Sequence, residues 1–235
     1  MYEYKCKFVK TNLKKAAAYW ISLGNATNNG VNNGIVSALA MNGTNNLFVG
    51  GVFSSVDGGS ISANNIASWD GNSWNILGTD LTNNGVDYGV YALAMNGTNQ
   101  LFVGGSFTHV DGSLISANNI ASWNGNSWSI LGSNSTNNGV EGGTDAVYAL
   151  AMNGINQLFV GGSFSSVDGS LISANNIASW DGNSWLSYGS SSDPSTSISA
   201  MIITFGNSLF VGGSFTTSPD GFCAPYLIQG RIILL

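Results

Sequence analysis

The sequence predicts an all-β fold made of repeated four-stranded antiparallel units, and three observations support this prediction. The pentapeptide Leu-Phe-Val-Gly-Gly occurs four times, at 47–51, 101–105, 158–162 and 209–213. A second block, Ala-Asn-Asn-Ile-Ala-Ser-Trp, follows the first three copies. The copies start 54, 57 and 51 residues apart. A period near fifty in strand-forming segments is typical of the blades of a β-propeller.

Each copy divides into four short strands that are rich in β-forming residues. In the second copy we expect these strands at 90–95, 100–107, 119–123 and 127–131. A glycine pair in the second strand is costly unless another backbone approaches closely, and the converging inner strands of a propeller provide that approach. These glycines are expected to tolerate a larger side chain far less than Gly139 does. They are Gly50, Gly51, Gly104, Gly105, Gly161 and Gly162.

Turn signals lie between the predicted strands in each complete copy. Asn-Gly and Asp-Gly pairs fit two-residue hairpins of type I′, because both central residues of that turn need a positive φ. The pairs between the first and second strands are 42–43, 96–97 and 153–154, and those between the third and fourth are 70–71, 124–125 and 181–182. The turns therefore agree with the division into strands.

Three copies are complete and one is partial. They lie at about 35–78, 90–132, 146–189 and 198–235. The partial copy has a degenerate third strand at 224–230, and its fourth strand is missing or reduced to 232–235. Residues 19–24 match a fourth strand that has no copy of its own. We therefore expect four blades closed into a ring by residues 19–24. The alternative is a slice of a longer repeat array.

The repeats resemble the kelch and galactose-oxidase-like propeller superfamily, in particular a subgroup rich in Gly and Asn. A strand ending in Gly-Gly, an aromatic strand and a spaced tryptophan carry this resemblance over roughly residues 20–230. The tryptophans are Trp74, Trp128 and Trp185, with Trp20 at the same position in the unassigned strand. The resemblance implies a propeller and a secreted or surface protein. It does not select a function, because the superfamily contains enzymes, adhesins and scaffolds.

Charge is scarce and unevenly distributed. Only 8% of residues are charged, the net charge is −6, and all five lysines lie in the first fifteen residues. The composition shift predicts a leader at 1–18 and a propeller domain at 19–235. The acidic balance argues against a nucleic-acid partner, and no apolar run is long enough for a membrane span. The leader lacks the apolar h-region of a secretory signal. We therefore expect either that the protein is not exported by that route or that this chain lacks its true start.

Residues suited to catalysis are few. The single histidine, His109, takes the place of Ser55 and Ser166 in the other copies. No lysine or arginine lies between residues 16 and 230 to hold a carboxylate or phosphate. One histidine is too few for galactose-oxidase-like copper chemistry, and no His/Cys cluster has metal-ligand spacing. We therefore predict no catalytic residues and no metal ligands.

Two groups of acidic residues call for different interpretations. The aspartates of the Val-Asp-Gly segments, Asp57, Asp111 and Asp168, are interpreted as turn residues, as are the hairpin residues Asp70 and Asp181. Other acidic residues lie in the connections between copies, which we regard as non-repeating and where oxygen ligands could bind calcium without a recognisable motif. Together with the histidine they form a candidate binding face of Asp80, Asp87, His109, Glu141 and Asp145.

The predicted function is non-catalytic binding of a protein or glycan, or structural display at a surface, because function concentrates on loops held by a rigid scaffold. Two alternatives stay open: a propeller enzyme that uses loop carboxylates, such as a glycan-cleaving enzyme, and a fragment of a larger repeat protein with no independent function. The tryptophan pairs either stack on sugars or, as we favour, pack in the core. Cys6 and Cys223 are either separate thiols or a ring-closing disulfide.

Overall fold

The described part of the chain is almost entirely β-structure. The computed structural model describes residues 22–24, 29–43, 46–97, 99–133, 135, 138–142, 144, 146–154, 157–188, 196–204, 207–214 and 232–234. Within these residues the single helical element is a short 3-10 turn at Asp57–Gly59. No helix in this part of the chain is long and apolar enough to cross a membrane. The predicted all-β fold of four-stranded antiparallel units is confirmed.

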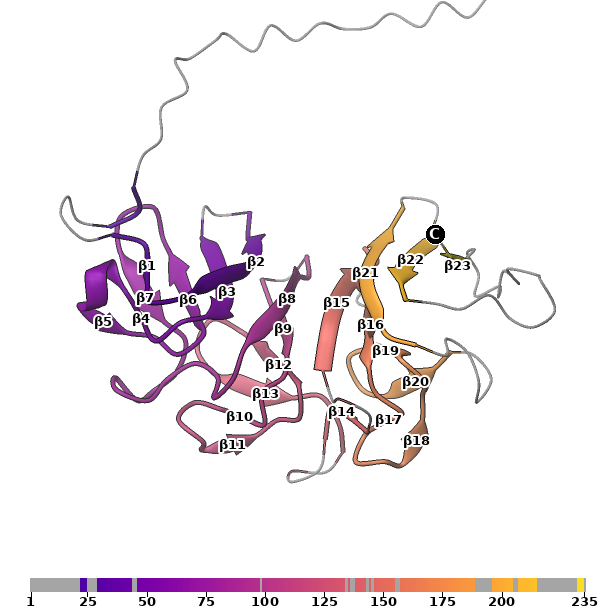
Figure 1. The fold of residues 1–235 in the computed structure, drawn as a ribbon. Helices are drawn as coiled ribbons and strands as arrows, with labels where there is room; N and C mark the ends of the chain where they lie inside the picture. Colours follow the sequence, from indigo (N-terminus) through magenta and orange to yellow (C-terminus); the bar gives the residue numbers. More distant parts are fainter. Residues whose placement is uncertain are drawn as a thin grey trace, which may run out of the picture.

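Three complete four-stranded antiparallel sheets, blades 1 to 3, follow the predicted copies. Blade 1 contains β2 (Ile35–Met41), β3 (Leu47–Val52), β6 (Ile66–Trp69) and β7 (Trp74–Ile76); blade 2 contains β8 (Val90–Met95), β9 (Leu101–Gly105), β12 (Ile120–Trp123) and β13 (Trp128–Ile130); blade 3 contains β15 (Ala146–Met152), β16 (Leu158–Ser163), β19 (Ile177–Trp180) and β20 (Trp185–Ser187). Each sheet runs in that order, and the blades follow one another as in a propeller (Figure 1).

Blade 4 differs from the others at its third position. It pairs β21 (Ile198–Ile203) with β22 (Leu209–Gly213), and β22 with β23 (Ile232–Leu234) in parallel. The expected third strand at 224–230 lies outside the described residues. Of the two options for the fourth strand, missing or reduced to 232–235, the second is wrong, because residues 232–234 pair with β22. The reason is that this copy lacks the Ala-Asn-Asn segment, so the apolar residues 232–234 pair with the otherwise open edge of β22.

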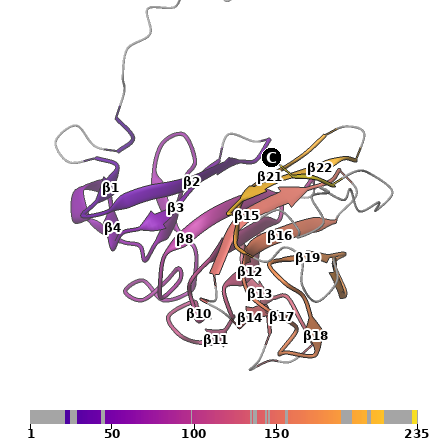
Figure 2. The ribbon, with the colours of Figure 1, turned by 45° about the vertical axis from the view of Figure 1, so that its right-hand side comes forward.

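Three small sheets, here called linker sheets, lie in the connections between the second and third strands of each blade and between the copies. The first contains β1 (Val31–Asn32), β4 (Ser55–Val56) and β5 (Ile61–Ser62); the second contains β10 (His109–Val110) and β11 (Ile115–Ser116), with Val86 bridged to Val110; the third contains β14 (Val140–Glu141), β17 (Ser166–Val167) and β18 (Ile172–Ser173). Figure 2 shows the second and third linker sheets together, below blades 2 and 3.

The hairpin turns are not of type I′. In the turn from β8 to β9, the Asn96 N–H donates to the Gln100 carbonyl over 3.0 Å, and Asn99 has the positive φ. Asn96 Oδ1 also accepts the Gln100 N–H, so this side chain holds a five-residue loop. In the turn from β6 to β7, Gly71 has a φ of 99° and its neighbours Asp70 and Asn72 have no positive φ, a pattern that belongs to type II′.

The strand glycines lie where backbones and side chains approach closely. A Cβ on Gly104 would be 3.0 Å from Cβ of Val147 in the next blade, and a Cβ on Gly105 would overlap the carbonyl oxygen of Gly89 beside a β-bulge in its own blade. Gly139 is equally constrained, with a φ of 76° and the Asn118 carbonyl in the place of a Cβ. The expectation that Gly139 tolerates a larger side chain is therefore wrong.

Tryptophans connect each blade to the copy before it. The Trp128 indole N–H donates to the Leu77 carbonyl over 3.1 Å, and the Trp185 indole N–H donates to Leu131 over 3.0 Å. The Trp74 indole N–H donates in the same way to the Leu23 carbonyl over 3.1 Å. Residue 23 therefore lies where the end of a preceding fourth strand belongs. Trp20 lies outside the described residues, and ring closure by residues 19–24 stays a prediction.

Candidate binding face at the linker sheets

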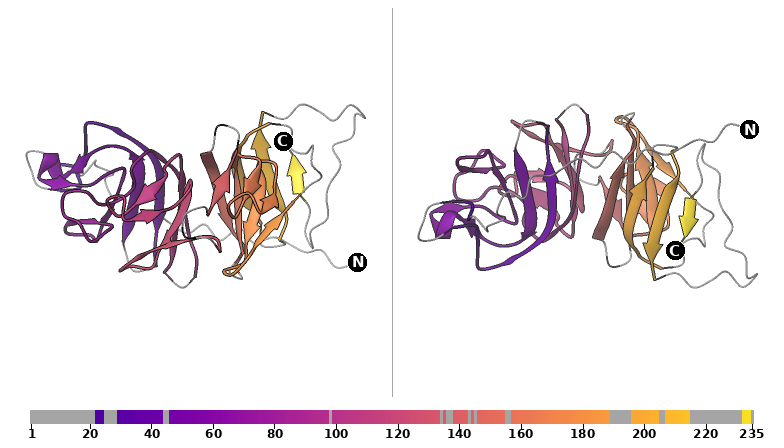
Figure 3. Two further views of the ribbon diagram at one scale, coloured as in Figure 1. Left: turned by 90° about the horizontal axis from the view of Figure 1, so that it is seen from below. Right: turned by 90° about the horizontal axis from the view of Figure 1, so that it is seen from above.

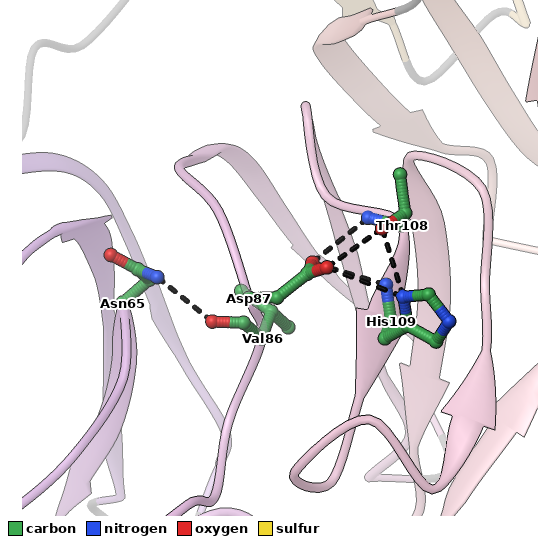
Figure 4. Close-up of polar contacts among 5 residues, drawn as sticks. All are labelled: Asn65, Val86, Asp87, Thr108 and His109. Carbon is green, nitrogen blue, oxygen red and sulfur yellow. Dashed lines mark hydrogen bonds and ion pairs between the residues drawn. The ribbon is translucent and has the colours of Figure 1, made fainter.

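The second asparagine of each Ala-Asn-Asn segment fixes a linker sheet to its blade. Asn65 Oδ1 accepts the Phe53 N–H over 3.1 Å, while its Nδ2 donates to the Val86 carbonyl over 2.8 Å (Figure 4). Asn119 Nδ2 donates to the Val140 carbonyl over 3.0 Å in the next copy. Both asparagines are buried and have positive φ values, which Asn tolerates better than most residues. The sequence analysis assigned them no role, although their repetition was visible.

The aspartates of the Val-Asp-Gly segments join neighbouring copies, which corrects their interpretation as turn residues alone. Asp111 Oδ1 accepts the Thr79 N–H over 2.6 Å, and its Oδ2 accepts the Thr79 hydroxyl over 3.0 Å. Asp168 makes the same contacts with Ser133. The aspartates themselves have positive φ values. Their carboxylates therefore bind the backbone just after the fourth strand of the preceding copy.

Asp87 and His109 are brought together at the second linker sheet (Figure 4). Asp87 Oδ1 accepts the backbone N–H groups of Thr108 and His109, over 2.8 and 3.0 Å. Its Oδ2 accepts the Thr108 hydroxyl over 2.7 Å and lies 3.3 Å from His109 Nδ1. Partial burial raises the pKa of Asp87, but the Thr108 and His109 hydrogen bonds outweigh it and leave the pKa below its usual value.

Glu141 occupies the matching position of the third linker sheet. One carboxylate oxygen accepts the Asn118 side-chain amide over 2.9 Å, and the other accepts the Ser170 hydroxyl over 2.7 Å. Glu141 pairs with Ser166 across the sheet, as Asn32 pairs with Ser55 in the first linker sheet. The face therefore carries a polar residue at the same place in each repeat.

The remaining candidates do not join these clusters. Asp80 Oδ1 accepts the backbone N–H and the hydroxyl of Thr82, both over 2.8 Å, within its own exposed turn. These two hydrogen bonds outweigh desolvation and lower the pKa of Asp80. Asp145 lies outside the described residues. Among the residues that the structure describes, no three His, Cys, Asp or Glu side chains are grouped as metal ligands.

The sequence analysis missed a repeat in the connections between copies. The segment Thr-Asn-Asn-Gly-Val occurs at 27–31, 82–86 and 136–140, and it leads into the linker sheets. Its second asparagine is buried in two copies: Asn84 Nδ2 donates to the Ser62 carbonyl, and Asn138 Nδ2 donates to the Ser116 carbonyl, both over 2.9 Å. These connections therefore have a repeated structure that is held by hydrogen bonds, and the expectation that they are non-repeating is wrong.

Large apolar side chains are exposed on the same face. Leu114 and Leu171 are each 71% exposed at equivalent tips of the second and third linker sheets. Leu81 and Tyr88 are exposed in the connection that leads to the second linker sheet. The sequence analysis selected only the polar residues of this face and did not predict that these four apolar side chains belong to it.

The tryptophan pairs of blades 2 and 3 lie in the blades and away from solvent, whereas Trp69 in blade 1 is partly buried. Trp123 and Trp128 are both buried, with ring centroids 5.4 Å apart, and Trp180 and Trp185 repeat this arrangement. These rings pack in the blade cores, so they offer no open face on which a sugar could stack.

Comparisons with known proteins add little to this geometry. No family model and no curated protein matches the chain. A solved structure described as "YCF48 bound to D1 peptide" is similar over 75% of this chain and 45% of that chain, with 12% sequence identity and a TM-score of 0.39. This chain thus spans less than half of that neighbour's length. The fold is established by the sheets described above, and the kelch and galactose-oxidase-like resemblance stays an expectation.

Proposed function

We propose that this chain is a non-catalytic β-propeller module that binds a protein partner through the linker-sheet face. The observation that carries this proposal is the pair of equivalent exposed leucines, Leu114 and Leu171, at the tips of the linker sheets that also hold the hydrogen-bonded carboxylates of Asp87 and Glu141. Apolar side chains surrounded by polar groups are typical of protein interfaces. The resemblance to kelch and galactose-oxidase-like propellers, a superfamily that contains scaffolds and adhesins as well as enzymes, is part of this proposal.

A protein partner fits this face better than a glycan does. Sugar recognition relies on exposed aromatic rings, and the tryptophans of blades 2 and 3 are buried. On the described part of the face Tyr88 is the one large aromatic side chain that is mostly exposed. Aliphatic tips such as Leu114 gain most from burial against another protein surface.

The carboxylates of the face are poorly suited to acid–base catalysis. A carboxylic acid that donates a proton near neutral pH needs a raised pKa, whereas hydrogen bonds lower the pKa of Asp87 and Asp80. Both oxygens of Glu141 already accept hydrogen bonds from Asn118 and Ser170. These carboxylates therefore hold the loops in place.

The experiment is selection of a phage-displayed peptide library on the immobilised full chain. We expect enriched peptides to bind the wild type and to lose at least tenfold in affinity on the double variant Leu114→Ser, Leu171→Ser. The matched control is Asn126→Ser, an exposed hairpin residue between β12 and β13. It should leave binding unchanged, because it lies outside the linker sheets.

Three outcomes would overturn the proposal. Equal losses on the leucine variant and on the Asn126 variant would move the site away from the linker sheets. Specific binding to a glycan array without any enriched peptide would favour a glycan ligand. Hydrolysis of a glycan that is abolished by Asp87→Asn would show that the module is an enzyme.

A further inference from the structure

Each internal boundary between blades is built from the same two parts. On one side is the first glycine of the second strand, and on the other is a β-branched residue of the next inner strand. A Cβ on Gly50, Gly104 or Gly161 would lie 3.0 to 3.1 Å from Cβ of Val90, Val147 or Ile198 respectively. All three β-branched side chains are 0% exposed. The contact is therefore a repeated, closely fitting interface.

The first blade exposes one half of this interface, which we call the leading face. Strand register places Val36 at the position of Val90 and Val147. Val36 is 44% exposed, and Leu39 and Met41 on the same strand are each 61% exposed. In blade 2 the corresponding leucine and methionine pack against the core shared with blade 1. The leading face of blade 1 thus has the residues of a blade boundary and no neighbour within the described residues.

The fourth blade exposes the other half, which we call the trailing face. Gly212 pairs with Ala200 as Gly104 pairs with Ala92, so it occupies the position of the contact glycines. Around Gly212 the nearest atom to an added Cβ is Cβ of Ala200, in the same blade, at 3.9 Å. Ile202 is 65% exposed on this blade. Space for a neighbouring blade is therefore present on the trailing face.

We propose that a second copy of this chain covers both faces, so that two chains form one eight-bladed ring. The trailing face of each copy packs on the leading face of the other, and Gly212 then meets Val36 as Gly104 meets Val147. Both halves are carried by this one chain, which makes a second copy the complementary partner. Two such contacts close a two-fold ring, and eight blades lie within the usual range of about four to eight.

The arrangement of the blades favours a second copy over contact within one chain. Figures 1 and 3 show blade 1 and blade 4 at opposite ends of the row of blades, so the leading and trailing faces do not meet within one chain. The Leu23 carbonyl also accepts the Trp74 indole N–H, as the last residue of a preceding fourth strand does. In the two-chain ring, residues 22–24 of one copy then lie next to blade 4 of the other.

The first test measures the mass of the full chain in solution by light scattering after size-exclusion chromatography. We expect twice the 24.4 kDa of one chain for the wild type. Leu39→Asp and Gly212→Val should each halve the measured mass. Both sites are open within one chain, so circular dichroism should show that the halved species keeps its β-structure. Leu186→Asp is the matched control, because Leu186 is exposed on the outer strand β20 and should leave the mass unchanged.

The second test traps the contact with cysteines at Val36 and Gly212, after both native cysteines have been replaced by serine. Internal boundaries place the equivalent Cβ atoms 3.0 to 3.1 Å apart, about 0.5 Å closer than the lower end of the disulfide range. Val36→Cys removes the Cγ atoms that a side chain at Gly212 would meet first, so a small outward shift of one blade lets the two sulfur atoms bond. Oxidation should give a two-chain band on a non-reducing gel. A disulfide within one chain, a one-chain mass at every concentration, or a ladder of masses that grows with concentration would each overturn the two-chain ring.

Discussion

Replacing Gly104 with alanine tests the contact between blades 2 and 3 directly. The new Cβ would lie 3.0 Å from Cβ of Val147 and overlap its Cγ1, whereas carbon atoms normally approach to about 3.5–4.0 Å. The Val147 side chain is fully buried and β-branched, so it has little freedom to move away from the new Cβ. Overpacking of this kind costs about 1–3 kcal/mol, and the lower backbone entropy of unfolded alanine offsets about 0.4–1 kcal/mol.

We therefore expect Gly104→Ala to lower the free energy of unfolding by about 1–2 kcal/mol. Urea unfolding followed by tryptophan fluorescence measures this, because the tryptophans of blades 2 and 3 are buried. Gly97→Ala is the matched control, since nothing lies within 4 Å of a Cβ at that turn, and its effect should stay within about 0.5 kcal/mol. Equal midpoints for the two variants would refute the close-contact explanation.

Three further predictions concern the polar residues of the linker sheets. Asp111→Ala leaves the Thr79 N–H without its acceptor and should lower the free energy of unfolding by about 1–3 kcal/mol in urea, against no more than about 0.5 kcal/mol for the exposed Asn126→Ala. Asn119→Ala should lower the free energy of unfolding by about 1 kcal/mol more than Asn119→Gly does in the same assay. Both variants lose the hydrogen bond to Val140, and only alanine is strained at a φ of 65°. The lowered pKa of Asp87 stabilises the fold above the unfolded pKa of about 3.9, and this stabilisation is lost as the pH falls through the folded pKa. Asp87→Asn should therefore reduce the drop in urea midpoint between pH 6 and pH 3.

Each of these predictions has a result that contradicts it. Equal urea midpoints for Asp111→Ala and Asn126→Ala would mean that the Thr79 contact adds nothing. If Asn119→Gly lowered the free energy of unfolding more than Asn119→Ala, backbone strain would not explain the effect. If the urea midpoint of Asp87→Asn fell between pH 6 and pH 3 as much as that of the wild type, other carboxylates would account for the acid sensitivity.

The blades were predictable because their signals are local. The inner strand of blade 2 was expected at 90–95, and β8 spans Val90–Met95. The strand expected at 100–107 is β9, Leu101–Gly105. Residues that favour β-strands, turn residues and repetition all coincide within a few residues of each strand, so the strands could be located from the sequence.

The linker sheets were not predictable because they depend on distant pairs. Val86 bridges Val110, and Asp111 binds Thr79 from 32 positions along the chain. Strands of two residues, such as β14, give no periodic pattern. The candidate site was therefore predicted only in part: Asp87 and His109 come together, while the exposed Leu114 and Leu171 were not recognised.

The contacts between copies have a consequence for how such a chain can grow or shrink. The tryptophan, asparagine and aspartate contacts each join one copy to the next, as Trp128 joins Leu77 and Asp111 joins Thr79. A copy on its own makes none of these contacts, and a linear pair makes one set of them, so their number grows with the number of copies. Inserting or deleting one whole copy by unequal recombination recreates the same joints between the new neighbours. The number of blades can therefore change in a single genetic step without any compensating substitution at the joints.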